Sequence, residues 1–280
     1  MVDKIPGAFV RAVLVMVLLA TPSLLLQGSG SGTDTTQAIA FMGLFAGALT
    51  FFEYASAYPG LIEFRYAPPF NRIRYLSLFA TVFLLTLICR GLSDQTPLTV
   101  FVRAIGAIIG QAIDFPYSPV RLVVLMMPEG MSAEHLELVR MCAGMAYLIS
   151  LLTLSVFVIL LKIFDWPSRN GAFNVWINLP TFDPTVGGDV VARLERDARF
   201  NVALGFLLPF LIPVVVKAAS ASFQPITLES PQTLIWTMAT WAFLPASLFM
   251  RGIAMSRISD MIREKRRQSR AAADPSLQPV

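Results

Sequence analysis

Glu53 is the residue whose type and position most suggest chemistry, because it ends an apolar run long enough to cross a membrane. It follows Gln37 by sixteen residues, which corresponds to about 24 Å of helix. A carboxylate in lipid is costly and often functional, so Glu53 could belong to a proton or substrate pathway. Because Arg65, Arg72 and Arg74 follow closely, we favour an ion pair with one of them, or a hydrated carboxylate at the headgroups.

The loop that carries these arginines, 58–74, is rich in proline, tyrosine and phenylalanine. Proline stiffens the backbone, and aromatic side chains prefer the level of the lipid headgroups. We expect a rigid aromatic loop that anchors its two flanking helices or presents a docking surface to a partner.

Sulfur and imidazole side chains align at helical spacing farther along the chain. Met131, His135, Cys142 and Met145 fall on one face, and thioether, imidazole and thiol groups are ligands that Cu(I) prefers. Methionine and cysteine more often fill a helix interface, so we predict packing here, with no metal and no other cofactor. A disulfide between Cys89 and Cys142 remains a hypothesis that depends on their distance.

Glycine and proline pairs point to helix packing and to a kink. Gly43 with Gly47, and Gly106 with Gly110, form two GxxxG motifs, which allow helices to approach closely either within one chain or between chains. Two prolines four residues apart, Pro209 and Pro213, predict a kink whose freed carbonyl groups need neighbours or water.

No catalytic constellation can be assigned. The run GSGSG at 28–32 has no serine with glycine two residues before and two residues after it, as a nucleophile elbow requires. The chain also lacks the GxxxxGK and HExxH motifs, and it has one histidine. We therefore name no catalytic residue and favour a protein that is not an enzyme, without closing the question.

The elements that position these residues are helices in a membrane. Of the 280 residues, 55% are hydrophobic and 14% charged, and the mean hydropathy is +0.65, which is typical of membrane proteins rather than soluble domains. We predict an all-α, polytopic bundle within 1–256. Six runs reach the roughly 20 residues that a span needs: 9–27, 37–57, 75–92, 141–163, 201–218 and 233–253. The first could instead be a cleaved signal peptide.

The distribution of lysine and arginine predicts the orientation. These residues concentrate in the 58–74 loop, the 164–200 loop and the 257–280 tail, whereas 28–36 and 219–232 contain none. Positive charge favours the cytoplasmic side, so both termini and the 164–200 loop should be cytoplasmic. The basic tail should be partly disordered and attract anionic lipid, although its charge is also explained by orientation alone.

The segment 97–114 needs a separate account. It is helical in pattern, with one face that is polar or small: Thr99, Arg103, Gly106, Gly110 and Asp114. The 16 residues 98–113 reach about 24 Å, which is short for a span, so we predict an interfacial or re-entrant helix. A seventh span is the alternative, but it would break the charge pattern.

These features favour a non-catalytic subunit, anchor or assembly partner of a larger complex in the cell inner membrane. The expected partners are the lipid bilayer and other membrane subunits or a second copy of the chain. Nucleic acid is excluded, because the basic residues lie beside apolar runs rather than on one polar face. The alternative is a small-solute or ion transporter that uses Glu53 and the kinked fifth span. A membrane-embedded enzyme is the third hypothesis.

Overall fold

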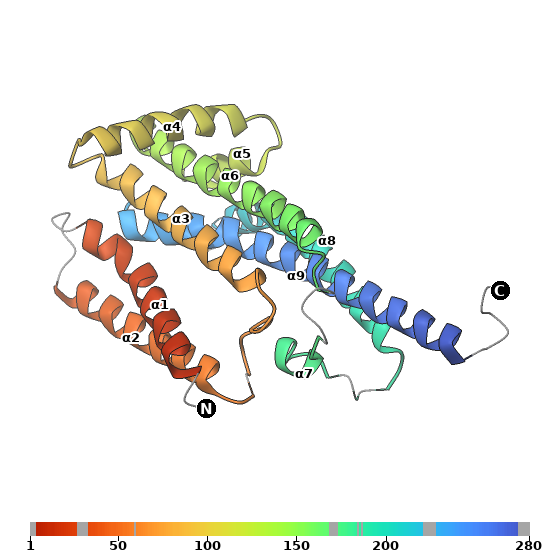
Figure 1. The fold of residues 1–280 in the computed structure, drawn as a ribbon. Coiled ribbons are helices and arrows are strands. Elements are labelled where there is room, and N and C mark those ends of the chain that lie inside the picture. Colours follow the sequence, from red (N-terminus) through yellow and green to blue (C-terminus); the bar gives the residue numbers. More distant parts are fainter. Residues whose placement is uncertain are drawn as a thin grey trace.

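A computed structural model describes residues 4–26, 33–58, 60–167, 173–183, 185, 187–220 and 228–273. Every regular element within these ranges is a helix (Figure 1). In chain order the helices are α1 (Ile5–Leu25), α2 (Thr33–Ala55), α3 (Phe70–Arg90), α4 (Pro97–Ile113), α5 (Pro119–Met126), α6 (Ala133–Ile163), α7 (Val175–Asn178), α8 (Val190–Ala219) and α9 (Pro231–Ala273).

Six of the described helices are long and apolar enough to cross a membrane, namely α1, α2, α3, α6, α8 and α9. A helix needs about 20 mostly apolar residues to cross a hydrocarbon core of about 30 Å. The predicted fold class, an all-helical membrane bundle with about six spans, is confirmed. The chain has the architecture of a multi-pass membrane protein.

Several helices extend beyond the apolar runs of the sequence. The spans predicted to start at 141 and 201 lie within longer helices, because α6 begins at Ala133 and α8 begins at Val190. The predicted end of the last span at 253 does not end the helix, since α9 continues to Ala273. Residues 274–280 of the predicted tail lie outside the described residues.

Polar caps explain the early helix starts. The Ser132 hydroxyl accepts a hydrogen bond from the backbone N–H of His135 at 3.2 Å, at the first turn of α6. The Asp189 carboxylate accepts one from the backbone N–H of Ala192 at 3.3 Å, at the first turn of α8. Such caps satisfy N–H groups that have no partner within the helix. Hydropathy misses these turns because it marks only the part of a helix that suits lipid.

The predicted interfacial or re-entrant segment 97–114 forms α4, which is shorter than the six spanning helices. Its first turn is closed by a capping box: the Thr99 N–H donates to the Thr96 hydroxyl at 3.3 Å, and the Thr96 N–H donates to the Thr99 hydroxyl at 2.9 Å. α4 packs against α6 and α3, and it runs along the upper edge of the bundle in Figure 1. The short helix α5 follows and packs against α6 and α8.

The spanning helices pack most closely in pairs. α8 lies along α9, and α1 lies along α2. In Figure 1 the pair α8 and α9 projects beyond the other helices, with the C-terminal end of α9 at its far end. α2 packs mainly on α1, and it leaves large apolar side chains such as Phe41 and Phe45 exposed, as expected for a helix facing lipid or another membrane protein.

The buried side chains form two cores at different levels of the bundle. The first core lies among α3, α4, α5, α6 and α9 and includes Leu85, Val123 and Val139. The second core joins the loops before α3 and around α7 to α6, α8 and α9, and it includes Phe64 and Leu194. Loops that connect spans are therefore packed into a hydrophobic core rather than lying loosely over the surface.

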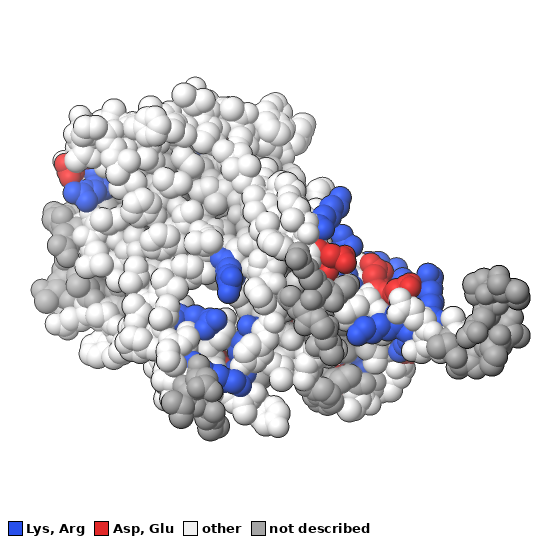
Figure 2. All heavy atoms as spheres, viewed as in Figure 1, with Lys and Arg blue, Asp and Glu red and all other residues white. Residues whose placement is uncertain are grey.

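The two ends of the bundle differ in charge. We call the end that contains the loops 60–69 and 173–183 and the projecting parts of α8 and α9 the arginine-rich end. We call the end with α4 and α5 the opposite end. Figure 2 shows lysine and arginine side chains gathered toward the arginine-rich end, whereas the face over α3, α4 and α6 is largely uncharged.

Candidate functional site

The Glu53 carboxylate is held by the backbone of the loop that follows it. Its oxygens accept hydrogen bonds from the N–H groups of Gly60 at 3.1 and 3.2 Å, Leu61 at 3.0 Å and Ile62 at 3.2 Å. The loop folds back so that three successive N–H groups converge on one carboxylate, an arrangement that stabilises negative charge. Backbone donors, rather than an arginine side chain, therefore provide the hydrogen-bond partners of Glu53.

Arg65 contacts the backbone carbonyl groups at the end of α2, next to the Glu53 carboxylate. Its buried guanidinium donates to the backbone carbonyl of Glu53, and also to the carbonyl of Ala57 at 3.4 Å. It lies 4.6 Å from the centre of the Tyr66 ring, which favours a cation. Arg65 thus satisfies carbonyl groups at the C-terminus of α2, where the helix dipole also favours positive charge.

The other two predicted arginines lie apart from Glu53. The guanidinium of Arg74 is 5.4 Å from the centre of the Phe70 ring and 5.7 Å from that of Phe243, so it lies between aromatic faces of α3 and α9. Arg72 is exposed. The structure therefore brings Glu53 together with Arg65 alone among the three, and through the backbone carbonyl of Glu53.

A bidentate ion pair at this end joins Glu63 to Arg251 of α9. The guanidinium binds both carboxylate oxygens, with N–O distances of 2.6 and 2.8 Å, and the Thr181 hydroxyl donates to the same carboxylate at 2.7 Å. Bidentate pairs between arginine and a carboxylate are among the stronger hydrogen-bonded contacts in proteins. Sequence reasoning missed it because its two members are 188 residues apart, and no local spacing relates them.

Asn178 joins the two loops of the arginine-rich end. Its backbone carbonyl accepts the N–H of Phe64 at 2.7 Å, and its side-chain oxygen accepts the N–H of Tyr66 at 3.0 Å. Its amide nitrogen donates to the carbonyl of Asn174 at 3.0 Å. A buried amide with both ends satisfied holds a loop in one conformation.

We call the joined loops, 60–69 and 173–183, the loop platform. At its edge, Tyr58 is 86% exposed and Leu61 70% exposed, although Phe64 beside them is buried. The side chains of Tyr58 and Leu61 therefore point toward the surface, whereas hydrogen bonds and the second core hold the backbone beside them in place. The sequence predicts a rigid aromatic loop here, and these contacts are consistent with that prediction.

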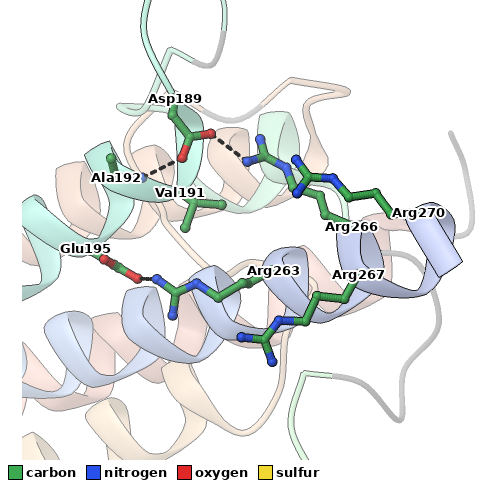
Figure 3. Close-up of a pocket in the computed structure, with 8 residues that line it drawn as sticks. All are labelled: Asp189, Val191, Ala192, Glu195, Arg263, Arg266, Arg267 and Arg270. Carbon is green, nitrogen blue, oxygen red and sulfur yellow. Dashed lines mark hydrogen bonds and ion pairs between the residues drawn. The ribbon is translucent and has the colours of Figure 1, made fainter. Parts of the chain in front are cut away.

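A second charged site lies between the start of α8 and the projecting part of α9 (Figure 3). It is a pocket of about 290 Å³. Arg266 lies 2.6 Å from a carboxylate oxygen of Asp189, and Arg263 pairs with Glu195. The hydrogen bond from Arg266 holds the pKa of the Asp189 carboxyl below its ordinary value. These pairs fasten the basic part of α9 to α8.

Arg267 and Arg270 line the same pocket. Neither forms an ion pair with a carboxylate in the described part of the chain. Figure 3 shows both on the α9 side of the pocket, next to Arg266. The pocket therefore has four arginines and two carboxylates, and it carries an excess of positive charge.

The sulfur and imidazole face lies in and beside the first core. Cys89 and Cys142 are both buried, and both are free thiols. Met145 is buried and Met131 packs against the first core, whereas His135 lies in the capped first turn of α6. Across the described ranges, no group of three or more His, Cys, Asp or Glu side chains could hold a metal ion.

Asp114 organises an ion cluster at the opposite end. Its carboxylate lies 2.9 Å from the Nε of Arg121 and 2.7 Å from the Nε of Arg140, and Arg140 also pairs with Glu137. These contacts tie α4 to α5 and α6. The predicted polar face of 97–114 includes Asp114, but the sequence does not indicate which arginines it meets.

Both GxxxG motifs are used within the chain. A Cβ added at Gly47 would lie 2.7 Å from a methionine side chain of α1, and Gly43 faces α1 more loosely. Gly106 packs against α3 and α6, and Gly110 packs against the backbone of α6, where a Cβ added at Gly144 would lie 2.7 Å from the Cα of Gly110. Close approach between α4 and α6 therefore requires glycine on both helices.

The two prolines of α8, Pro209 and Pro213, are both buried. Because Pro213 has no N–H, the carbonyl of Pro209 loses its helical partner. The indole Nε1 of Trp241 donates to that carbonyl at 3.2 Å. A neighbouring side chain therefore satisfies this freed carbonyl group, one of the two possibilities that the sequence leaves open.

Comparison of the chain with protein-family models, with curated proteins and with solved structures finds no match.

Proposed function

We propose that the protein is a non-catalytic subunit, anchor or assembly partner of a larger complex in the cell inner membrane. In this proposal the arginine-rich end faces the cytoplasm, as the positive-inside rule favours, and the loop platform docks a partner subunit. Exposed α2 offers a second surface for partner helices or lipid.

The observation that carries the proposal is the exposure of Tyr58 and Leu61 beside a fixed backbone. Asn178, Arg65 and Glu63 hold the adjoining loop segments through the contacts given above. A surface that is ordered before binding loses little conformational entropy when a partner docks. Exposed tyrosine is also enriched at interfaces, because its ring is apolar and its hydroxyl can remain hydrated.

Purification in a mild detergent tests this function. The wild-type protein should retain a membrane-protein partner in a fixed ratio, and the double substitution Y58A/L61A should release it. Y117A is the matched control, because Tyr117 is 88% exposed and lies in the turn before α5, at the opposite end. A single monodisperse species without a partner, or equal loss of the partner in the control, would contradict the proposal.

The same two positions test the orientation. A cysteine introduced at Tyr117 should react with a membrane-impermeant thiol reagent added outside intact cells, whereas a cysteine at Tyr58 should react only after the membrane is opened. The reverse pattern would reject the proposed topology.

The transporter alternative receives less support. Glu53 would have to exchange a proton or contact a solute, but its carboxylate is already held by Gly60, Leu61 and Ile62. The subunit proposal instead gives Glu53 the role of closing a turn. E53Q should therefore weaken partner binding through disorder of the loop. Loss of solute uptake by a stably folded E53Q variant would favour the transporter.

A further inference from the structure

An open groove of about 720 Å³ lies between α8 and α9, next to the arginine pocket. Its lining changes from charged to apolar along its length. Residues on one face of each helix line it at spacings of three or four: Arg199, Val202 and Phe206 on α8, and Phe249, Ile253 and Arg257 on α9. The charged ends of the two series lie on the same side, because the two helices run antiparallel.

The groove crosses the level where the membrane should end. The apolar runs of α8 and α9 are 201–218 and 233–253. At about 1.5 Å per residue, Arg199 and Arg257 lie about 3 and 6 Å beyond these runs. Phe206 lies within the apolar run of α8. Its side chain lines the groove and is 61% exposed. The charged end of the groove is therefore at headgroup level and its apolar end is among the acyl chains.

The two arginines of the groove are available for a ligand. Neither Arg199 nor Arg257 forms an ion pair within the residues that the structure describes. The carboxylates nearby are engaged elsewhere, because Glu195 pairs with Arg263, and Asp260 lies 3.5 Å from the same guanidinium. Together with Arg263, three arginines meet two carboxylates here, so the groove keeps a net positive charge.

The floor of the groove is backbone and small side chains. A Cβ added at Gly252 would lie 2.7 Å from the carbonyl oxygen of Ala198, so α8 and α9 almost touch there. Ala203, which also lines the groove, is exposed. An elongated, shallow channel with a smooth floor suits a flexible hydrocarbon chain better than a folded peptide.

We propose that the groove binds an anionic phospholipid from the leaflet at the arginine-rich end. The phosphate lies between Arg199 and Arg257, whose planar guanidinium groups suit phosphate oxygens. One acyl chain follows Val202, Phe206 and Phe249 into the membrane. This site is separate from the loop platform, and it does not depend on the proposed docking of a partner.

Native mass spectrometry of the purified full-length protein tests the site with defined lipids. Phosphatidylglycerol and phosphatidylcholine with identical acyl chains provide the comparison. Because each arginine near a membrane surface adds attraction for anionic lipid, the wild type should retain phosphatidylglycerol about tenfold better. R199Q/R257Q should reduce that preference to near unity. R267Q/R270Q is the matched control, since it removes the same charge from the arginine pocket and should keep the preference.

A second variant tests the acyl-chain half of the groove. A203F places a ring in the groove from an exposed position, so it should fold normally and lower phosphatidylglycerol binding without changing charge. Inorganic phosphate alone should not displace the lipid. Equal retention of the two lipids by the wild type, loss of preference in R267Q/R270Q, unchanged binding by A203F, or displacement by inorganic phosphate would each overturn the proposed site.

Discussion

Replacing Glu63 with glutamine would test whether one ion pair holds the loop platform on the helical bundle. The substitution keeps the shape of the side chain and removes its charge. It leaves the guanidinium of Arg251 without its bidentate partner, while the Thr181 hydroxyl can still donate to the new amide oxygen. We expect lower stability and a loop platform that opens more readily.

The expected magnitude follows from the burial of the pair. The Glu63 side chain is 12% exposed and that of Arg251 is 25% exposed, so water screens neither charge strongly. Leaving one member of a fully buried pair unpaired costs about 3–5 kcal/mol, and the partial exposure of Arg251 lowers our expectation to about 2–3 kcal/mol. For large domains, each kcal/mol of lost stability lowers the Tm by about 2–4 °C, so the apparent Tm should fall by about 5–10 °C.

Thermal unfolding in mild detergent, followed by tryptophan fluorescence, would measure this decrease. Limited proteolysis at the arginine-rich end would report opening of the loop platform. E129Q is the matched control, because Glu129 is an exposed carboxylate in the turn between α5 and α6. Its apparent Tm should equal that of the wild type.

A double-mutant cycle provides the decisive comparison. E63Q/R251Q should be less destabilised than the sum of its two single variants, because the double variant leaves no unpaired charge. Strictly additive effects would show that the two side chains do not stabilise the fold through one another. An unchanged rate of proteolysis in E63Q would show that the ion pair does not hold the loop platform.

Three further predictions concern other contacts. Gly144→Ala should lower the free energy of unfolding by about 1–3 kcal/mol, because its Cβ would overlap the α4 backbone; thermal unfolding would measure this. Trp241→Phe should lower the free energy of unfolding by about 1–3 kcal/mol in the same assay, since it leaves the buried carbonyl of Pro209 in α8 without its hydrogen-bond donor. The pKa of the Asp189 carboxyl is lower in the folded protein than in the unfolded chain. The ionised carboxylate therefore stabilises the folded state fully above the unfolded-state pKa, and this stabilisation is lost as the pH falls through the folded-state pKa. Spin labels on α8 and α9 should therefore report separation of the two helices near Arg266 only in acid.

Each of these predictions has a control within the chain. Gly187→Ala should leave stability unchanged, because a Cβ at Gly187 would meet no atom within 4 Å. Trp236→Phe removes an indole N–H from the same helix without breaking the bond to α8. D189N should abolish the acid-dependent separation. If D189N keeps that separation, or if Gly187→Ala is as destabilising as Gly144→Ala, the corresponding explanation fails.

The architecture could be predicted from the sequence because lipid imposes a simple rule. Backbone polar groups in a membrane must be satisfied within the chain, so a run of about 20 apolar residues becomes a helix. The apolar run 141–163 does not mark where α6 starts, because the Ser132 cap extends the helix into a polar segment. Hydropathy measures suitability for lipid and does not measure where hydrogen bonds end a helix.

The candidate site could be predicted only in part. Glu53 and Arg65 were identifiable because they lie near one another in sequence and at a membrane boundary. Their actual contacts depend on how residues 60–62 fold back, which no spacing reveals. Glu63 and Arg251 were missed for a stronger reason, since their contact exists only after α9 has packed beside the loop between α2 and α3.

The sequence alone determines that this is a helical membrane protein with about six spans and one shorter helix, because composition and run length act locally along the chain. Tertiary structure alone decides which charges meet. It holds Glu53 with backbone N–H groups, pairs Glu63 with Arg251, and fastens the basic end of α9 to α8 through Asp189 and Glu195. The physical reason is that an electrostatic contact depends on distance in space, whereas hydropathy depends on neighbours in sequence.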